Sequence, residues 1–284
     1  MAGPLQFEAP TALEYFAALV ADDGSLSVLE AAVAVAQDDE PGLDVQGVLA
    51  HIDALAERMR SRVPPDAAPL QRLRLLNQYF FHELGFGGNV NDYYDARNSS
   101  VASVLETRRG IPLTLALIYI EMATQLGLQA HGISFPGHFL VKVHMLRGEV
   151  IIDPFSGRSL GREELEERLL PFRHQRGLTG DDEIPLGLFL QAASPREVVA
   201  RLLRNLKEIH RSTRDWARLA AVTQRLVILL PDEWTERRDL GLVLSRNGHT
   251  EQAIRELQLY LQNCPDAADA PSMRKELAVW RRTR

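Results

Sequence analysis

Around Gly127 the spacing of the hydrophobic residues changes from that of a helix to that of strands. Residues Leu113–Gln125 are apolar on nearly every side, which predicts a helix buried in the centre of a domain. Pro112 suits its first turn, where a missing N–H does no harm, and Gly127 suits its end. Beyond it, alternation predicts short strands at Gln129–Phe135, His138–Leu146 and Glu149–Asp153, separated by glycine turns. The sequence therefore predicts a small antiparallel sheet beside a buried helix.

The chain before this region has helical periodicity. Thr11 and Glu14 form a capping-box pattern at the start of the first expected helix. Further helices are expected at Leu26–Ala36, Val45–Arg62 and Leu70–Leu84, with a break at the prolines of residues 64–65. Another helix is expected from Gly161 to about Leu170, after the sheet.

From about residue 186 onward the pattern is helical alone. Pro231 and Pro265 lie 34 residues apart, which is the period of a tetratricopeptide (TPR) repeat. Trp234, Gly241, Gly248 and Ala253 occupy the large and small positions that such a repeat requires. The preceding segment, residues 199–231, fits this pattern less well, so a plain helical bundle is the alternative interpretation.

Composition limits the classes of function. The 284 residues are 45% hydrophobic and 25% charged, which is typical of a folded protein, and the formal net charge of -6 disfavours nucleic-acid binding. The one cysteine, Cys264, cannot form an intramolecular disulfide, and the histidines and carboxylates show no metal-binding spacing. The N-terminal residues lack the pattern of a signal peptide, and no apolar stretch is long enough to cross a membrane. We expect a cytoplasmic protein without a cofactor or metal.

Two polar residues flank the expected sheet strands. His138 opens one strand and Asp153 ends the next, so an antiparallel hairpin would bring the two side chains together. A carboxylate that accepts from one imidazole nitrogen leaves the other nitrogen available as a base. A nucleophile would be expected in the first turn of the buried helix, where the helix dipole lowers the pKa of a thiol. A purely structural hydrogen bond between two strands is the alternative.

Five short motifs occur in an order that resembles one bacterial protein family. They are Asn91-Asp-Tyr-Tyr94, Arg97-Asn98-Ser99, Arg108-Arg-Gly-Ile-Pro112, Gly132-Ile-Ser-Phe-Pro-Gly-His-Phe-Leu140 and Ile152-Asp-Pro-Phe155. Over about residues 30–170 the chain resembles the SirB-type family of transglutaminase-like proteins, whose C-terminal part the TPR-like tail also resembles. The resemblance implies an α+β fold with a transglutaminase or papain-like core, whose active members carry a Cys-His-Asp triad. We expect an N-terminal helical segment at 1–66 packed on the core, the core itself at 67–175, and an all-α TPR-like domain at 186–284.

The chain departs from that family pattern at the nucleophile. Active transglutaminase-like enzymes open the central helix with a Gly-x-Cys motif, whereas this sequence has Gly110-Ile-Pro112 there. A prolyl ring supplies neither a nucleophile nor an N–H for an oxyanion hole. Thr114 is the hydroxyl residue nearest to this position, and it is a poor nucleophile without strong activation. The candidate catalytic set is therefore His138, Asp153 and Thr114, and it is expected to be vestigial.

A polar loop precedes the buried helix and could bind a ligand. Tyrosines supply flat amphipathic contact area, and arginines bind carboxylates or phosphates through two hydrogen bonds. The alternative is a turn whose Asn and Asp side chains satisfy the loop's own backbone. The candidate ligand-binding residues are Asn91, Asp92, Tyr93, Tyr94, Arg97, Asn98 and Arg109.

Three functions remain open on the sequence. The leading hypothesis is a pseudoenzyme that acts as an interaction or regulatory adaptor, with a peptide or small ligand in the core and a protein partner on the TPR-like tail. The second is a hydrolase or amidase that uses His138 and Asp153 with Thr114 or water. The third is a structural role in which the tail drives self-association. No membrane or nucleic-acid partner is expected.

Overall fold

The computed structural model describes residues 10–178 and 184–282 of the chain. The chain divides into two compact units, each described separately here. One unit comprises Val28–Val33 and Asp44–Leu202, and it contains the sheet and the central helix. The other comprises Met1–Ser27, Ala34–Leu43 and Leu203–Arg284, and it is helical in its described part. The predicted α+β fold class, with an all-α tail, is confirmed.

The first unit is built on a four-stranded antiparallel sheet. Its strands β3 (Gln129–Ile133), β4 (Leu140–His144), β5 (Glu149–Asp153) and β6 (Arg158–Leu160) pair in sequence order. The register pairs Ile133 with Leu140 and Val141 with Ile152, so the strands form a meander. The fourth strand was not predicted, because three residues are too few to show alternation.

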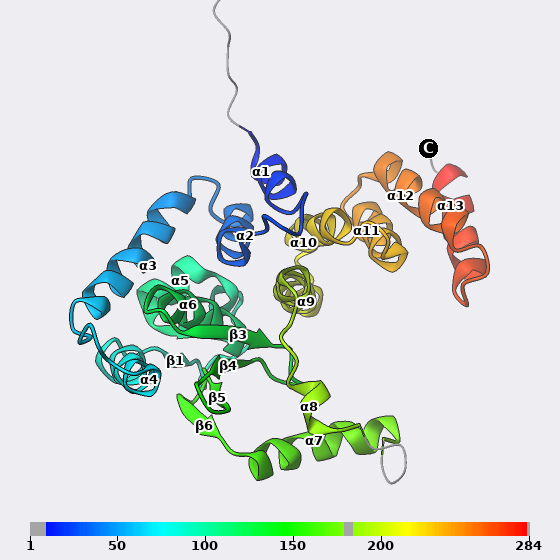
Figure 1. Cartoon of the computed structure of the whole chain (residues 1–284). Helices are drawn as coiled ribbons and strands as arrows, with labels where there is room; N and C mark the ends of the chain where they lie inside the picture. The colour runs from blue at the N-terminus through cyan, green and yellow to red at the C-terminus, as the bar shows by residue number, and fades with distance from the viewer. Residues whose placement is uncertain (1–9, 179–183, 283–284) are drawn as a thin grey trace, which may run out of the picture. The chain divides into compact units, whose positions relative to one another are not determined.

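The central helix α6 (Pro112–Gln125) packs on β3 and β4, and Figure 1 shows it beside β3. Most of its side chains are buried, as the apolar sequence predicts. Pro112 occupies the first turn, and Gly127 follows the helix with φ of 74°, the left-handed conformation that glycine adopts without strain. A short parallel pair, β1 (Gly87–Gly88) and β2 (Arg109–Gly110), lies directly before this helix in contact with it.

Further helices complete the first unit. They are α2 (Val28–Val35), α3 (Val45–Arg60), α4 (Pro69–Asn77), the π-helical turn η2 (Gln78–Glu83), the 3₁₀ turn η3 (Ala96–Ser99), α5 (Val101–Thr107), α7 (Arg162–Arg176) and α8 (Leu186–Phe189). The predicted helix from Leu70 to Leu84 is therefore α4 continued by a π-helical turn. Helix α7 extends past the predicted end at Leu170 and contains Pro171.

The second unit contains α1 (Ala12–Leu19), η1 (Ala36–Asp38), α10 (Trp216–Leu229), α11 (Trp234–Arg246), α12 (Thr250–Asn263) and α13 (Ala270–Arg282). Helix α9 (Pro195–Thr213) runs from the first unit into this one. Consecutive helices from α10 to α13 pack against one another, as in a helical-repeat array. The predicted capping box at α1 is confirmed, because Thr11 and Glu14 each bond the other's backbone.

The N-terminal segment is shared between the two units. Helix α3 lies against α6, whereas α1 lies against α10. The reason is a fully buried arginine of α10, Arg225, whose guanidinium lies 4.8 Å from the centroid of the Phe16 ring and bonds both oxygens of Asp38 at 2.6 and 2.7 Å. The predicted division into an N-terminal helical segment at 1–66 packed on the core, a core at 67–175 and a TPR-like domain at 186–284 stays a prediction.

Candidate functional site

His138 and Asp153 meet at one end of the sheet. His138 lies in the turn before β4, which is closed by a 3.0 Å hydrogen bond from its N–H to the carbonyl of Phe135. Gly137 allows this turn through its φ of 70°. Asp153 is the last residue of β5, and Nε2 of His138 lies 2.7 Å from Oδ1 of Asp153. The hairpin thus brings together the two residues that the sequence placed at its strand ends.

The Asp153 carboxylate is buried and accepts four hydrogen bonds. Besides His138, the donors are the backbone N–H of Phe155 at 3.0 Å, the Ser156 hydroxyl at 3.0 Å and Nη1 of Arg168 at 3.3 Å. Burial raises the pKa of this carboxyl. The hydrogen bond and charge of His138 lower it by more, with help from the hydrogen bonds of Phe155 and Ser156, so the pKa of Asp153 lies well below its usual range. Asp153 therefore stays ionised and orients the imidazole through Nε2.

Thr114 lies in the first turn of α6 and is fully buried. Its hydroxyl donates to the carbonyl of Asn98 at 2.7 Å and approaches the carbonyl of Ile111 at 3.1 Å. The Asn98 carbonyl also accepts the N–H of Ile111 at 3.2 Å. These bonds attach the start of the central helix to the polar loop. Pro112, which occupies the position expected for the nucleophile two residues before Thr114, is buried as well.

The polar loop, residues 91–99, satisfies many of its own polar groups. Nδ2 of the buried Asn98 donates to the carbonyls of Asp92 at 2.6 Å and Tyr93 at 3.2 Å, and its Oδ1 accepts from Asn89 at 3.0 Å. Arg97 pairs with Asp95 at 2.6 Å. A ligand would have to compete with these bonds for Asn98 and Arg97.

The remaining predicted binding residues differ in availability. Asn91 and Asp92 are exposed at the start of the loop. Arg109 donates through Nη1 to the carbonyls of Gly85 at 2.5 Å and Arg108 at 3.0 Å, so this nitrogen braces the loop backbone. Tyr93 and Tyr94 are 42% and 79% exposed, and their rings offer the most accessible apolar surface of the loop.

An aromatic side chain connects this loop to the histidine. The Phe155 ring lies 5.9 Å from that of Tyr93 and 6.4 Å from that of His138, measured between centroids. It packs on the backbone of Gly88, where an added Cβ would lie 2.2 Å from Cε2 of the ring. Only glycine fits at this position without displacing Phe155. Tyr93, Phe155 and His138 therefore form one continuous surface, which we call the aromatic surface.

Arg201 belongs to this site but was not predicted from the sequence. Arg201 of α9 donates to the Ser134 hydroxyl at 2.7 Å, the Phe135 carbonyl at 3.2 Å and the His138 carbonyl at 2.7 Å. Burial lowers the pKa of Arg201, while the facing hydroxyl of Tyr93 opposes that change. Burial likewise raises the pKa of Tyr93, with Tyr94 adding to the increase and Arg201 reducing it. Arg201 thus fixes the turn that carries His138.

Comparisons with known proteins agree with this architecture. Residues 46–204 match the transglutaminase-like superfamily, and residues 206–278 match a tetratricopeptide repeat family. The chain belongs to the transglutaminase-like superfamily.

Several bacterial relatives support the predicted resemblance to the SirB-type family. A UPF0162 protein of Xylella fastidiosa is 37% identical over 257 residues, which cover 90% of each chain. A UPF0162 protein of Pseudomonas aeruginosa is 29% identical over 72% of this chain and 73% of its own. Protein SirB1 of Salmonella typhimurium is 26% identical over 84% of this chain and 86% of its own. The SirB-type resemblance with C-terminal TPR repeats is confirmed, whereas no solved structure gives a significant match.

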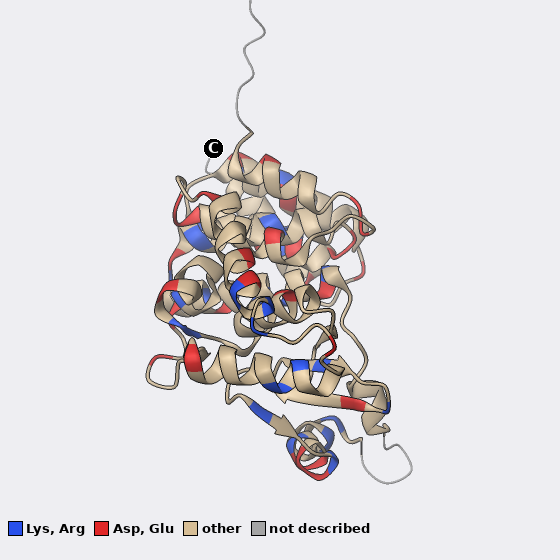
Figure 2. Cartoon of the chain, turned by 60° about the vertical axis from the view of Figure 1, so that its left-hand side comes forward, with Lys and Arg blue, Asp and Glu red and all other residues tan. Residues whose placement is uncertain are grey.

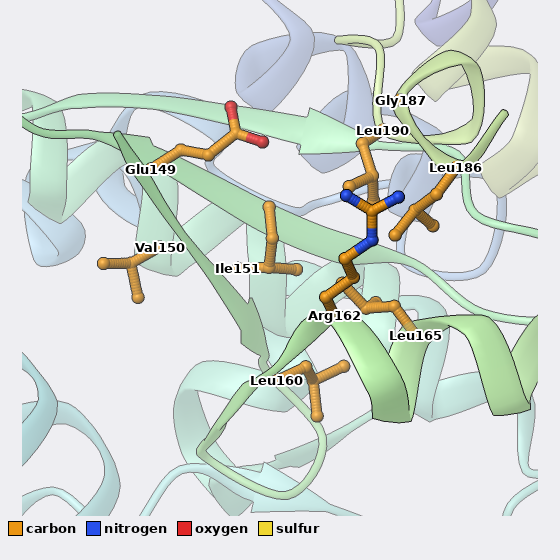
Figure 3. A pocket seen from close by; sticks show the side chains of 9 residues that line it. All are labelled: Glu149, Val150, Ile151, Leu160, Arg162, Leu165, Leu186, Gly187 and Leu190. Atoms are coloured by element: carbon orange, nitrogen blue, oxygen red, sulfur yellow. The ribbon is translucent and has the colours of Figure 1, made fainter. Parts of the chain in front are cut away.

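A pocket in the first unit lies apart from the predicted site residues. A pocket of about 410 Å³ lies between β5, β6, α7 and α8, and Figure 3 shows Glu149 and Arg162 among its mostly apolar lining. None of the predicted site residues lines this pocket. Residues 10–178 and 184–282 contain no group of three or more His, Cys, Asp or Glu residues suited to a metal ion. No helix in the same ranges has both the length and the apolar character that a membrane span requires.

Proposed function

We propose that this protein is a non-catalytic member of its superfamily that acts as a regulatory adaptor in the cytoplasm. In this proposal the helical tail docks a protein or peptide partner, and the core binds a peptide or small ligand at the aromatic surface. The observation that carries it is the start of α6, where the buried Pro112 stands in place of a thiol. The cysteine of this chain, Cys264, follows α12 in the other unit.

The hydroxyl nearest to that position is poorly suited to replace the thiol. Thr114 is fully buried, and its one proton is donated to the Asn98 carbonyl. Activation would require a base to take this proton, so the bond to Asn98 and part of the helix attachment would be lost. Asp153 holds four donors, which is consistent with His138 serving to connect the two strands.

The tail and the charge distribution favour protein partners. Helical repeats present extended surfaces on which partner segments bind. Figure 2 shows acidic and basic residues interspersed along the helices, and the formal net charge of -6 disfavours binding to a nucleic acid backbone.

The adaptor proposal is tested with full-length protein immobilised for partner capture, with bound proteins identified by mass spectrometry. Trp216→Ala changes the first residue of α10 in the tail, His138→Gln changes the core, and Leu188→Ala is a control at an exposed leucine. We expect a partner that is lost with Trp216→Ala and retained with the control. Circular dichroism verifies that each variant is folded. Retention of every partner by Trp216→Ala would remove the tail from the proposal.

One observation favours the alternative of a hydrolase or amidase. In the described part of the chain, Nδ1 of His138 has no hydrogen-bond partner, and 21% of this side chain is exposed. A neutral imidazole that donates through Nε2 to Asp153 keeps Nδ1 as an acceptor, so it could activate water.

The catalytic alternative is tested with peptide and glutamine-containing substrates. We expect no turnover above the buffer rate. Turnover that is present in the wild type and disappears in His138→Gln would overturn the non-catalytic proposal. Thr114→Val would then separate the two mechanisms, because it abolishes a threonine nucleophile but leaves attack by water.

A further inference from the structure

A second pocket lies in the helical tail, between α9, α10 and α11, with a volume of about 360 Å³. Leu219, Leu242 and Val243 form an apolar wall beside the half-buried Trp216. Arg211 and Arg246 line the same pocket and are exposed to solvent. The pocket therefore combines an apolar wall with accessible guanidinium groups.

The acidic side chain of this pocket is neutralised by neighbouring cations. Asp239 accepts from Nζ of Lys207 at 2.7 Å and from Arg238 at 2.7 Å, and Arg238 also pairs with Asp269 at 2.7 Å. Burial raises the pKa of Asp239, but the bonds and charges of Lys207 and Arg238 lower it by more, so it stays ionised within this network. Arg238 and Asp239 thus act as structural partners of each other.

The two exposed arginines keep donors available. The Arg246 guanidinium lies 4.6 Å from the centroid of the Trp216 ring, and within residues 10–178 and 184–282 it forms no hydrogen bond or ion pair. Arg211 reaches Glu208 at 3.5 Å and Asp239 at 3.6 Å, which are long contacts of a half-exposed side chain. Stacking on an aromatic face leaves the in-plane N–H groups of an arginine free to bind a carboxylate with two bonds.

We propose that this pocket binds an acidic segment of a protein partner, with an aliphatic side chain on the apolar wall and carboxylates at Arg246 and Arg211. This inference rests on the adaptor function proposed above and names the chemistry of the tail's partner. Charge complementarity favours an acidic occupant, because Arg246 and Arg211, two arginines without strong partners in the described part of the chain, line one pocket. A neutral or basic segment would leave these guanidinium groups without partners and gain the apolar contact alone.

The test measures binding of a fluorescein-labelled peptide of alternating glutamate and leucine to the full-length protein by anisotropy. Two companion peptides replace every glutamate by glutamine or every leucine by serine. We expect the glutamate–leucine peptide to bind at least about tenfold more tightly than either companion, because hydrogen bonds to charged groups are worth about 1.5–3 kcal/mol, or about tenfold to a hundredfold in affinity. Raising NaCl from about 50 mM to about 500 mM should weaken its binding.

Variants locate the effect in the pocket. Arg246→Gln should lower the affinity for the glutamate–leucine peptide about tenfold. Arg255→Gln, which changes an exposed arginine of α12 outside the pocket, should leave binding unchanged. The tryptophan fluorescence of the protein provides a second readout, because the bound peptide would change the surroundings of the Trp216 ring. Arg246→Lys should bind with intermediate strength, since it keeps the charge but not the paired donors.

The inference fails if the glutamine peptide binds as tightly as the glutamate peptide, or if Arg255→Gln weakens binding as much as Arg246→Gln. Its failure is distinguishable from failure of the adaptor function. A partner lost with Trp216→Ala but retained with Arg246→Gln would keep the adaptor and overturn the acidic segment. A partner lost with neither variant would overturn the acidic segment and would also remove the tail from the adaptor proposal.

Discussion

Replacing Asp153 by asparagine tests the interaction on which the geometry of the core site depends. The carboxylate accepts from His138, Phe155, Ser156 and Arg168, and it is only 4% exposed. The substituted amide keeps one acceptor oxygen, which can still receive the bonds from His138 and the Phe155 N–H. Its NH₂ group cannot accept from Arg168 or serve as the charged acceptor of the Ser156 hydroxyl.

The loss in stability follows from these bonds. Hydrogen bonds to a charged group contribute about 1.5–3 kcal/mol each, and the two affected bonds are long or partly exposed, so we expect Asp153→Asn to cost about 3 kcal/mol at neutral pH. At about 2–4 °C per kcal/mol for a chain unit of this size, the melting temperature should fall by about 6–12 °C.

The cost should depend on pH in one direction. A carboxyl whose pKa is lower in the folded state contributes stability above its unfolded pKa, and this contribution is lost as pH falls through the folded value. The unfolded value of aspartate is about 3.9. The difference between wild type and Asp153→Asn should therefore be constant down to about pH 4 and shrink below it.

The difference in stability between wild type and Asp153→Asn is measured by urea unfolding, followed by circular dichroism, at a series of pH values from 7 to below 3. Asp66→Asn is the matched control, because Asp66 is an exposed aspartate of the same unit. A change of less than about 0.5 kcal/mol for Asp153→Asn at pH 7 would be typical of a surface site and would refute the reasoning. So would a full loss that persists unchanged below pH 3.

Three further substitutions test other contacts. Gly88→Ala should displace the Phe155 ring and cost about 1–3 kcal/mol of stability in urea unfolding, whereas unchanged stability would show that the ring moves freely. Thr114→Val should cost about 1 kcal/mol through its lost hydroxyl bond, measured by the thermal midpoint, and a gain in stability would count against that bond. Arg225→Met should cost about 3–5 kcal/mol, because Asp38 loses its buried partner; melting curves that match the wild type would contradict this.

Local sequence patterns were sufficient to predict much of the core. The β5 bounds Glu149–Asp153 were predicted as observed, and the helix expected at Leu113–Gln125 begins one residue earlier, at Pro112. Both follow from periodicity and from residues that favour element ends. The meeting of His138 and Asp153 also follows from local information, since a short hairpin connects them.

Contacts between distant parts of the chain were not accessible in this way. Arg201 lies 63 residues from His138 in sequence and resembles any other arginine of an amphipathic helix. The bonds within the polar loop depend on the backbone conformation around Asn98, which the composition of the loop does not determine. The sequence identified the loop as polar but could not show how many of its groups were already satisfied.

The pairing of Arg225 with Asp38 has a consequence for biosynthesis. These residues are 187 positions apart, and both belong to the helical unit, which draws on both ends of the chain. During translation the first helix and η1 leave the ribosome long before α10 exists to cover them. The Phe16 side chain therefore lacks its contact with α10 until residues of the core between the two helices have been synthesised. The N-terminal helix thus leaves an apolar side chain uncovered until α10 is made, and a tail produced alone would lack Asp38, the partner of its buried arginine.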